Sequence, residues 1–244
     1  MRFRTLELPV DGLPPELHGV RIAHLSDFHL GMPSRGEEAT ARAIDWVAGR
    51  KPDVVCITGD LLSRRRGEAR LRTLLARLPV DPYVVLGNHD FAMSRDPFSE
   101  PAPLAELPRG TLLADSSVDV ELRGIRVEIA GVDPRSWLAR RPSAFGASDA
   151  PFRLLLCHFP RVLERAEDGR WHVILAGHLH GGQIVVPYGP RRRLLLAHPG
   201  AGYREGVFRR GATVMHVSPG LGTTFVPFRF FARPEVTELV LRSR

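Results

Sequence analysis

Two histidines lie one residue apart in the glycine-rich stretch AGHLHGGQ, which directly follows the apolar run HVIL. Imidazoles on so bare a backbone suit either a tight turn that happens to contain histidine or a pair of metal ligands. We expect His178 and His180 to alternate in direction along an extended segment, with one imidazole for each of two ions. The neighbouring Gly177, Gly181 and Gly182 would keep the backbone clear of such a site.

Four other apolar runs end in the same way, in a small residue followed by a carboxylate, an imidazole or an amide. These ends carry Asp27 and His29 in SDFH, Asp60 in TGD, Asn88, His89 and Asp90 in GNHD, and His158 in CHFP. Each residue alone is more often a cap, a turn residue or a satisfied core residue. Ligands of α/β sheets lie beyond the carboxyl ends of strands, so five such ends on one edge together predict a shared metal site.

The set of donors indicates which ions and which chemistry this site would support. Carboxylate, imidazole and amide oxygen, without thiolate, suit Mn, Fe or Zn. The donors are too many for one tetrahedral ion, so we expect two metal ions that share Asp60 as a bridging carboxylate. A two-metal centre activates water and neutralises phosphoryl oxygens during an in-line displacement. The sequence therefore predicts a dinuclear-metal-dependent phosphoesterase.

The elements that must position these residues alternate early in the chain and become mostly β later. Strand-like runs cover residues 20–27, 53–60, 82–88, 118–132, 151–158, 171–178, 211–220 and 235–243. Helical periodicity occurs in EEATARAIDWVAGRKP and GEARLRTLLARLP, which lie between the early strands. The run 118–132 predicts a hairpin that turns at Arg123-Gly124, whereas SRDPFSEPAPLAELPRG predicts an irregular connection or one short helix. We expect two packed sheets flanked by helices, in one domain spanning 1–244.

Composition excludes several other classes of protein. The 244 residues, of which 43% are apolar, suit a globular domain, and no run of ~18 uncharged apolar residues predicts a membrane span. No apolar leader begins the chain, so we expect a cytoplasmic protein, with a peripheral position at the inner membrane as an alternative. Cys56 and Cys157 lie in apolar runs and are predicted to be buried free thiols.

The net charge of +7 comes almost entirely from arginine, with clusters at 64–66, 140–141, 191–193 and 209–210. A solvated basic surface accounts for them, and attraction to phosphate-bearing substrates or to an anionic membrane is the alternative. Arg191–Arg193 would either meet a second phosphate or form a solvated loop. No motif predicts specific binding of nucleic acid.

The aromatic stretch FVPFRFF, residues 225–231, has two interpretations. The favoured one is a strand and turn that pack in the core. The alternative is an apolar wall that accepts an acyl chain or a base.

The motifs SDFH, GD, GNHD, CH and GHLH, in this order over residues 20–240, resemble the calcineurin-like metallophosphoesterases. GHLHGGQIVVP and SPGLGTTFVPFRFFARPEV are similar to the bacterial YkuE and YaeI branch, often described as phosphodiesterases. The resemblance implies an α/β (α+β) fold: a four-layer αββα sandwich of two mixed sheets flanked by helices.

The resemblance also assigns roles to the residues of the site. It implies one ion on Asp27, His29 and His180, a second ion on Asn88, His158 and His178, and Asp60 as the bridge. The nucleophile would be a hydroxide bridging the metals. His89 would face the phosphate and stabilise the transition state or protonate the leaving oxygen.

One position departs from the family pattern. Many relatives carry an acid three residues after the bridging aspartate, where it partners the catalytic histidine, but this chain has Ser63 there. Asp90, next to His89, is a candidate substitute.

The implied activity is a phosphodiesterase acting on a phosphate-ester small molecule or a lipid-linked substrate. A UDP-diacylglucosamine-type pyrophosphatase or a phosphomonoesterase on the same site are alternatives. A non-catalytic metal-bound scaffold and a nuclease are alternatives of other classes. The native substrate, the physiological metals and the oligomeric state are not determined by the sequence.

Overall fold

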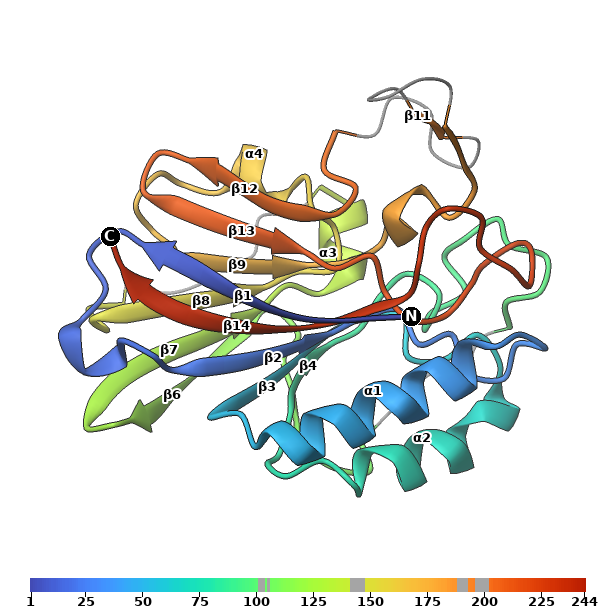
Figure 1. Ribbon diagram of the computed structural model, residues 1–244, viewed down its shortest axis with the longest axis horizontal. Helices are drawn as coiled ribbons and strands as arrows, with labels where there is room; N and C mark the ends of the chain where they lie inside the picture. Colours follow the sequence, from blue (N-terminus) through green and yellow to red (C-terminus); the bar gives the residue numbers. More distant parts are fainter. Residues whose placement is uncertain (101–103, 105, 141–147, 188–192, 196–201) are drawn as a thin grey trace.

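Two six-stranded sheets stack face to face and carry helices on their outer faces (Figure 1). The computed structural model describes residues 1–100, 104, 106–140, 148–187, 193–195 and 202–244. Both sheets mix parallel and antiparallel neighbours. The predicted sandwich of two mixed sheets flanked by helices is confirmed.

The first sheet contains the strands that carry the first three candidate motifs. Its strands, in spatial order, are β1 (Arg2–Val10), β14 (Glu235–Ser243), β2 (Arg21–Leu25), β3 (Val54–Thr58), β4 (Tyr83–Val85) and β5 (Thr111–Leu112). β2, β3 and β4 run parallel, and every residue of β3 is buried, as expected for a central strand covered on both faces. Parallel pairing brings the ends of the three strands to one edge of the sheet.

Two helices cover the outer face of the first sheet, and both match the predicted periodicity. They are α1 (Gly36–Arg50) and α2 (Glu68–Leu75). The apolar side of α1, including Ile44 and Val47, packs with Leu71 and Leu74 of α2 in the cluster that also holds Ile57 of β3. Lys51 caps the C-terminal end of α1; it adopts a left-handed conformation and donates its backbone N–H to the carbonyl oxygen of Val47.

The second sheet carries the remaining two candidate motifs. Its strands, in spatial order, are β12 (Gly206–Arg210), β13 (Thr213–Val217), β9 (Val173–Ala176), β8 (Phe152–Leu156), β7 (Ile125–Gly131) and β6 (Ser116–Leu122). The predicted hairpin is confirmed, since Leu122 of β6 pairs with Ile125 of β7 across Arg123-Gly124. Two short helices, α3 (Pro134–Leu138) and α4 (Val162–Arg165), lie on its outer face against Ile174.

The main core lies between the sheets, where side chains such as Ile22, Val54, Leu154 and Leu175 interdigitate. Both cysteines are buried free thiols, as predicted. No helix in the described part of the chain is long and apolar enough to cross a membrane.

Several elements were not predicted. They are β1, β5, β12, the short helices α3 and α4, the small hairpin of β10 (Val185–Pro187) and β11 (Arg193–Leu195), and the short 3-10 turns η1 (Pro15–Leu17), η2 (Arg65–Gly67) and η3 (His180–Gly182). β1 was missed because its partner is β14, at the other end of the chain, where Arg2 pairs with Glu235. Only non-local pairing makes this charged segment a strand.

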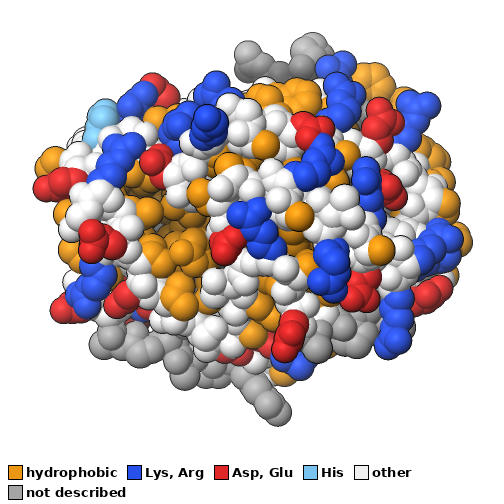
Figure 2. Space-filling model, turned by 90° about the horizontal axis from the view of Figure 1, so that it is seen from below, with side chains coloured by type: hydrophobic (Ala, Val, Ile, Leu, Met, Phe, Trp, Pro, Cys, Tyr) orange, Lys and Arg blue, Asp and Glu red, His pale blue; other side chains and the backbone are white. Residues whose placement is uncertain are grey.

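Basic and acidic side chains are interspersed over the face shown in Figure 2. Several clustered arginines are structural: Arg64, Arg66 and Arg210 donate to backbone carbonyls of neighbouring segments. Arg191 and Arg192 lie outside the described residues, so the contact with a second phosphate stays a prediction.

Candidate metal centre

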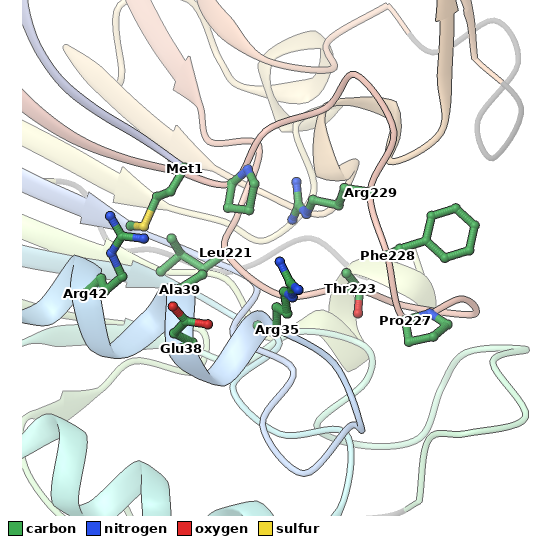
Figure 3. A pocket seen from close by; sticks show the side chains of 12 residues that line it. Met1, Arg35, Glu38, Ala39, Arg42, Leu221, Thr223, Pro227, Phe228 and Arg229 are labelled. Carbon is green, nitrogen blue, oxygen red and sulfur yellow. The ribbon is translucent and has the colours of Figure 1, made fainter.

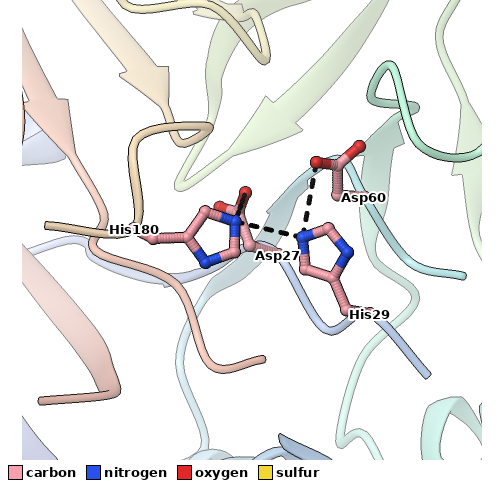
Figure 4. A group of neighbouring side chains, drawn as sticks. All are labelled: Asp27, His29, Asp60 and His180. Carbon is pink, nitrogen blue, oxygen red and sulfur yellow. Dashed lines mark hydrogen bonds and ion pairs between the residues drawn. The ribbon is translucent and has the colours of Figure 1, made fainter. Parts of the chain in front are cut away.

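Four buried side chains converge where the loops after β2, β3 and β9 meet (Figure 4). They are Asp27, His29, Asp60 and His180, and one ligand atom of each lies within 4.8 Å of all the others. His29 Nε2 is 3.1 Å from His180 Nε2 and 3.5 Å from an oxygen of Asp60. His180 Nε2 is 3.4 Å from Asp27 Oδ1. This first cluster joins the two sheets.

A second cluster shares Asp60 with the first and adds His158 and His178 from the second sheet. His158 Nε2 lies 3.2 Å from Asp60 Oδ2 and 3.1 Å from His178 Nδ1. The residues therefore do not lie along one sheet edge, as the sequence pattern suggested. They come from the edges of two sheets that face each other, and Asp60 stands between the two groups, where the prediction placed a bridge.

Two buried oxygens show that the clusters fit cations. Asp60 Oδ2 accepts no hydrogen bond within the described residues, although His158 Nε2 lies 3.2 Å from it as an ion pair, and Asn88 Oδ1 has no hydrogen-bond partner there. Buried polar atoms are nearly always hydrogen-bonded, so an open acceptor on Asp60 beside the imidazoles of His29 and His158, with a second on Asn88, fits a bound ion. The donor set of carboxylates, imidazoles and one amide is the set that divalent Mn, Fe or Zn would use. The six clustered side chains, together with Asn88, could hold two such ions.

Two glycines allow the backbone to approach the clusters closely. A Cβ atom on Gly87, just before Asn88, would lie 2.1 Å from Asp60 Oδ1. A Cβ atom on Gly177, just before His178, would lie 2.0 Å from Ser26 Oγ and 2.5 Å from Asp27 Oδ2. Any side chain at either position would displace a candidate ligand or its neighbour.

The two histidines of AGHLHGGQ do not lie on an extended segment, so this prediction was wrong. His178 has φ 78° and His180 has φ 50°, and η3 begins at His180. In a strand, residues two apart point to the same face, whereas the left-handed turns here send the two imidazoles to neighbouring clusters. Asp27, His29 and Asp60 also have positive φ, so backbone strain is concentrated at the candidate ligands.

The second cluster contains the strongest charge pairing. Burial alone would lower the pKa of His158, but the carboxylate of Asp60 outweighs burial and raises the pKa to about 9. Burial likewise opposes ionisation of Asp60, yet His158, His89 and His29 hold its pKa well below the usual value. His158 Nδ1 also lies 2.7 Å from the carbonyl oxygen of Thr58, an acceptor that would orient the ring.

The first cluster is a less charged environment. Burial lowers the pKa of His29 to about 3 and raises the pKa of Asp27 to about 6. Its imidazoles are therefore neutral at pH 7, the form that a metal ligand requires. Ser63 Oγ lies 2.9 Å from His29 Nδ1. Ser63, which stands where many relatives have an acid that partners the catalytic histidine, therefore contacts the candidate ligand His29 and not His89.

Arg229 holds His180 from the side away from the clusters. Its guanidinium donates to the carbonyls of Pro219 and Gly222 and lies 3.1 Å from His180 Nδ1. A guanidinium can only donate, so neutral His180 carries its proton on Nε2 while this hydrogen bond is made. The tautomer that would bind an ion through Nε2 carries the proton on Nδ1 and gives up this hydrogen bond. Sequence reasoning missed this contact because Arg229 lies within an otherwise aromatic stretch.

His89 lies beside the clusters and belongs to neither. The ring is buried and meets the His29 ring edge-on, with 4.7 Å between centroids. Its Nε2 is 3.4 Å from Thr224 Oγ1, and its Nδ1 is 2.5 Å from Ser99 Oγ. The backbone N–H of His89 donates to Asp60 Oδ1, which ties this residue to the proposed bridge.

Comparison with known proteins identifies the family. Residues 20–182 match the family described as calcineurin-like phosphoesterase. The chain is 30% identical over 244 residues to the uncharacterized metallophosphoesterase YkuE of Bacillus subtilis, covering 95% of this chain and 82% of that protein. This protein belongs to the calcineurin-like phosphoesterases. Members of the family use divalent metals, and membership implies a phosphoesterase hydrolase.

Two further comparisons extend the likeness of this calcineurin-like phosphoesterase. UDP-2,3-diacylglucosamine pyrophosphatase LpxG of Chlamydia muridarum is 24% identical over 282 residues, covering 90% of this chain and 83% of that protein. The solved structure of NAD nucleotidase from Haemophilus influenzae gives a TM-score of 0.51 at 14% identity, covering 83% of this chain and 45% of the other. The latter supports the fold alone.

This calcineurin-like phosphoesterase places a different acid near His89 from the one that the sequence suggested. Asp90 does not face the ring; its carboxylate accepts the backbone N–H groups of Leu62 and Gly87, each at 2.8 Å. Asp96 lies 3.9 Å from His89 Nδ1. Asp96 was missed because it follows the motif in an irregular proline-rich segment, where no spacing marks it.

Proposed function

We propose that this calcineurin-like phosphoesterase hydrolyses phosphodiesters at a two-metal centre. The observation that carries the proposal is the pair of adjoining clusters that share the buried, unbonded oxygen of Asp60. Asp27, His29 and His180 would hold one ion, His158, His178 and Asn88 the other, and Asp60 both. When bound, the ions would polarise the phosphoryl oxygens and lower the pKa of a water molecule.

The lack of free guanidinium groups bonded to the described clusters favours a diester over a monoester as substrate. A monoester carries about two negative charges at pH 7, whereas a diester carries one. Among the described residues, Arg229 is the only arginine bonded to a clustered ligand, and its N–H groups are directed to His180 and backbone carbonyls. In the part of the chain that the structure describes, no guanidinium bonded to the clusters is left to neutralise the extra charge of a monoester.

His89 is assigned the proton that the leaving oxygen needs. Its Nε2 lies on the side of Thr224, while its Nδ1 faces Ser99 and Asp96. Contacts at Nδ1 fix the ring plane, so that Nε2 can donate to the departing alkoxide or stabilise charge on the phosphoryl group. The strained backbone at Asp27, His29 and Asp60 keeps the carboxylates and imidazoles in place before substrate arrives.

The test compares a diester with a monoester on the same protein. Metal-stripped protein is reloaded with Mn, Fe, Zn or Mg, and turnover of bis-p-nitrophenyl phosphate is measured beside p-nitrophenyl phosphate. We expect metal-dependent cleavage with the diester preferred. Preference for the monoester would refute the assignment of substrate class. Absence of turnover with two ions bound would favour the binding scaffold.

A lipid-linked pyrophosphate is the second candidate substrate, because its internal phosphoryl groups are also singly charged. The specific observation in its favour is a cavity of about 440 Å³ beside Arg229 that combines basic and apolar side chains. The relative LpxG is named for cleaving such a compound. Hydrolysis of UDP-2,3-diacylglucosamine at a higher kcat/KM than the aryl diester would select this candidate.

A further inference from the structure

Exposed apolar side chains are concentrated on two loops that flank the candidate metal centre. Six of the ten large apolar residues that are exposed in the described part of the chain lie there: Phe225 (46% exposed), Phe228 (56%), Phe230 (46%) and Phe231 (63%) between β13 and β14, and Met93 (43%) and Phe98 (42%) after β4. We call these six residues the aromatic rim. The prediction that FVPFRFF packs in the core was wrong. Patches of this kind on a globular protein mark interaction surfaces.

The two loops are fastened to each other at Asp96. One Asp96 oxygen accepts the Thr224 hydroxyl at 2.8 Å and the Phe225 backbone N–H at 3.0 Å. The other accepts the Phe98 backbone N–H at 2.9 Å. At the far end of the rim, Phe230 exchanges backbone hydrogen bonds with the segment around Gln183, and its ring meets Phe231 at 4.7 Å. The rings are therefore presented outward by a hydrogen-bonded backbone.

The charges around the aromatic rim are mainly positive. Arg35, Arg95 and Arg233 are exposed beside it, and none of them forms an ion pair within the described residues. The acidic Asp96 is buried, and Glu100 lies 3.6 Å from Arg64. A partner that covers the rim must accept both aromatic rings and guanidinium groups.

A cavity of about 440 Å³ lies at the base of the rim, between α1 and the loop that carries Phe228 (Figure 3). Its apolar lining includes Met1, Ala39, Leu221, Pro227, Phe228 and Pro234, and its basic lining consists of Arg35, Arg42 and Arg229. Glu38 is the one acidic side chain that lines it. In Figure 3 the Phe228 ring projects outward from this cavity. The cavity therefore combines apolar side chains with arginines, as the aromatic rim and its surroundings do.

We propose that the aromatic rim docks on a lipid surface that bears anionic headgroups. Phenylalanine rings gain free energy by entering the boundary between headgroups and acyl chains, and nearby arginines are attracted to lipid phosphates. A second copy of the chain fits less well, because a symmetric contact would bring the unpaired arginines of both copies together. Since Thr224 joins the rim to His89 at 3.4 Å, docking turns the candidate centre toward the membrane.

Vesicle sedimentation of the full chain tests this proposal. We expect binding to phosphatidylcholine vesicles that contain phosphatidylglycerol and much weaker binding to phosphatidylcholine alone. Replacing two rings, Phe230→Ser with Phe231→Ser, should lower the partition coefficient about tenfold. Replacing two charges, Arg95→Glu with Arg233→Glu, should remove the preference for the anionic lipid.

Matched controls remove similar side chains elsewhere. Val207→Ser with Leu138→Ser takes away two other exposed apolar side chains (43% and 44% exposed), and Arg72→Glu reverses an exposed charge on α2. Both controls should bind vesicles as the wild type does. Equal binding by the ring variant and the wild type would overturn the proposal. So would a concentration-dependent dimer that the ring variant abolishes, which would assign the rim to a second copy.

The outcome is independent of the proposed phosphodiesterase activity. In the absence of vesicles, the ring variant should hydrolyse bis-p-nitrophenyl phosphate as fast as the wild type. Failure to bind vesicles with turnover intact refutes the docking surface alone. Vesicle binding by a protein without turnover upholds the surface and refutes the activity.

Discussion

Two groups of buried histidines lie between the sheets, and only one of them is surrounded by carboxylates. In the interior pair, His24 Nδ1 lies 2.8 Å from His216 Nδ1, and His24 Nε2 lies 2.9 Å from Thr58 Oγ1. Burial lowers the pKa of His216 to about 3 and that of His24 well below the usual value. In the metal centre, by contrast, Asp60 raises the pKa of His158 to about 9.

The difference teaches that burial alone does not make a histidine group a metal site. His24 lies on β2, three residues before Asp27, and is as deeply buried as the candidate ligands. What distinguishes the metal centre is the pairing of imidazoles with carboxylates and with an amide oxygen left open. The interior pair has only a hydroxyl and another imidazole for partners, and His216 Nε2 has no partner within the described residues.

The largest expected effect comes from breaking the carboxylate that distinguishes the two groups. Asp60→Asn should lose bound metal and activity together, with turnover falling by about a thousandfold or more, because both clusters share this oxygen. Metal content by elemental analysis and turnover of bis-p-nitrophenyl phosphate measure it. His216→Gln serves as the control and should keep both ions. Full metal content in Asp60→Asn would contradict the bridging role.

The next effect separates binding of metal from chemistry within the metal centre. His89→Asn should keep both ions and lose turnover by about a hundredfold to a thousandfold, because the ring lies beside the clusters and supplies a proton or a hydrogen bond. Parallel measurement of metal content and kcat checks this. Turnover equal to the wild type would remove His89 from the mechanism.

A smaller effect should come from the acid that faces His89. Asp96→Asn should lower kcat about tenfold with little change in KM, since Asp96 positions the ring without being a proposed metal ligand. The loss should be larger with phenyl than with p-nitrophenyl leaving groups, because the poorer leaving group depends more on protonation. Asp96→Glu should recover part of the rate. An equal loss for both leaving groups would indicate a purely structural role.

The interior pair predicts a pH effect on stability in metal-stripped protein. Both imidazoles have a lowered pKa in the folded state, so the unfolded chain binds more protons below its ordinary pKa of about 6.5. Stability is therefore present above that pH and is lost as the pH falls. His216→Gln should reduce the slope of unfolding free energy between about pH 6 and pH 4 by about 1.4 kcal/mol per pH unit. Urea unfolding at several pH values measures it, and an unchanged slope would contradict the assignment.

Much of the metal centre could be predicted because each motif is local. SDFH, TGD, GNHD, CHFP and GHLH each follow a buried strand, and parallel pairing within each of the two sheets brings such ends to that sheet's edge. The family resemblance then divided the residues between two ions. The structure gathers the six carboxylate and imidazole residues into two clusters that share Asp60, and the assignment of ions, with Asn88 on the second, stays a prediction. The supporting contacts were not predictable, because Ser63, Asp96 and Arg229 are joined to the histidines by loops without periodicity.

The sequence by itself determined the types of ligand, the strands that carry them and the family, since these depend on short-range patterns of residues. Only the tertiary structure decided that the ligands come from two facing sheets, that left-handed turns aim His178 and His180 at neighbouring clusters, and that FVPFRFF faces outward. These features depend on contacts between segments far apart in the chain. An apolar stretch can have the same sequence in a core and on the aromatic rim, and only the packing of other segments around it distinguishes the two.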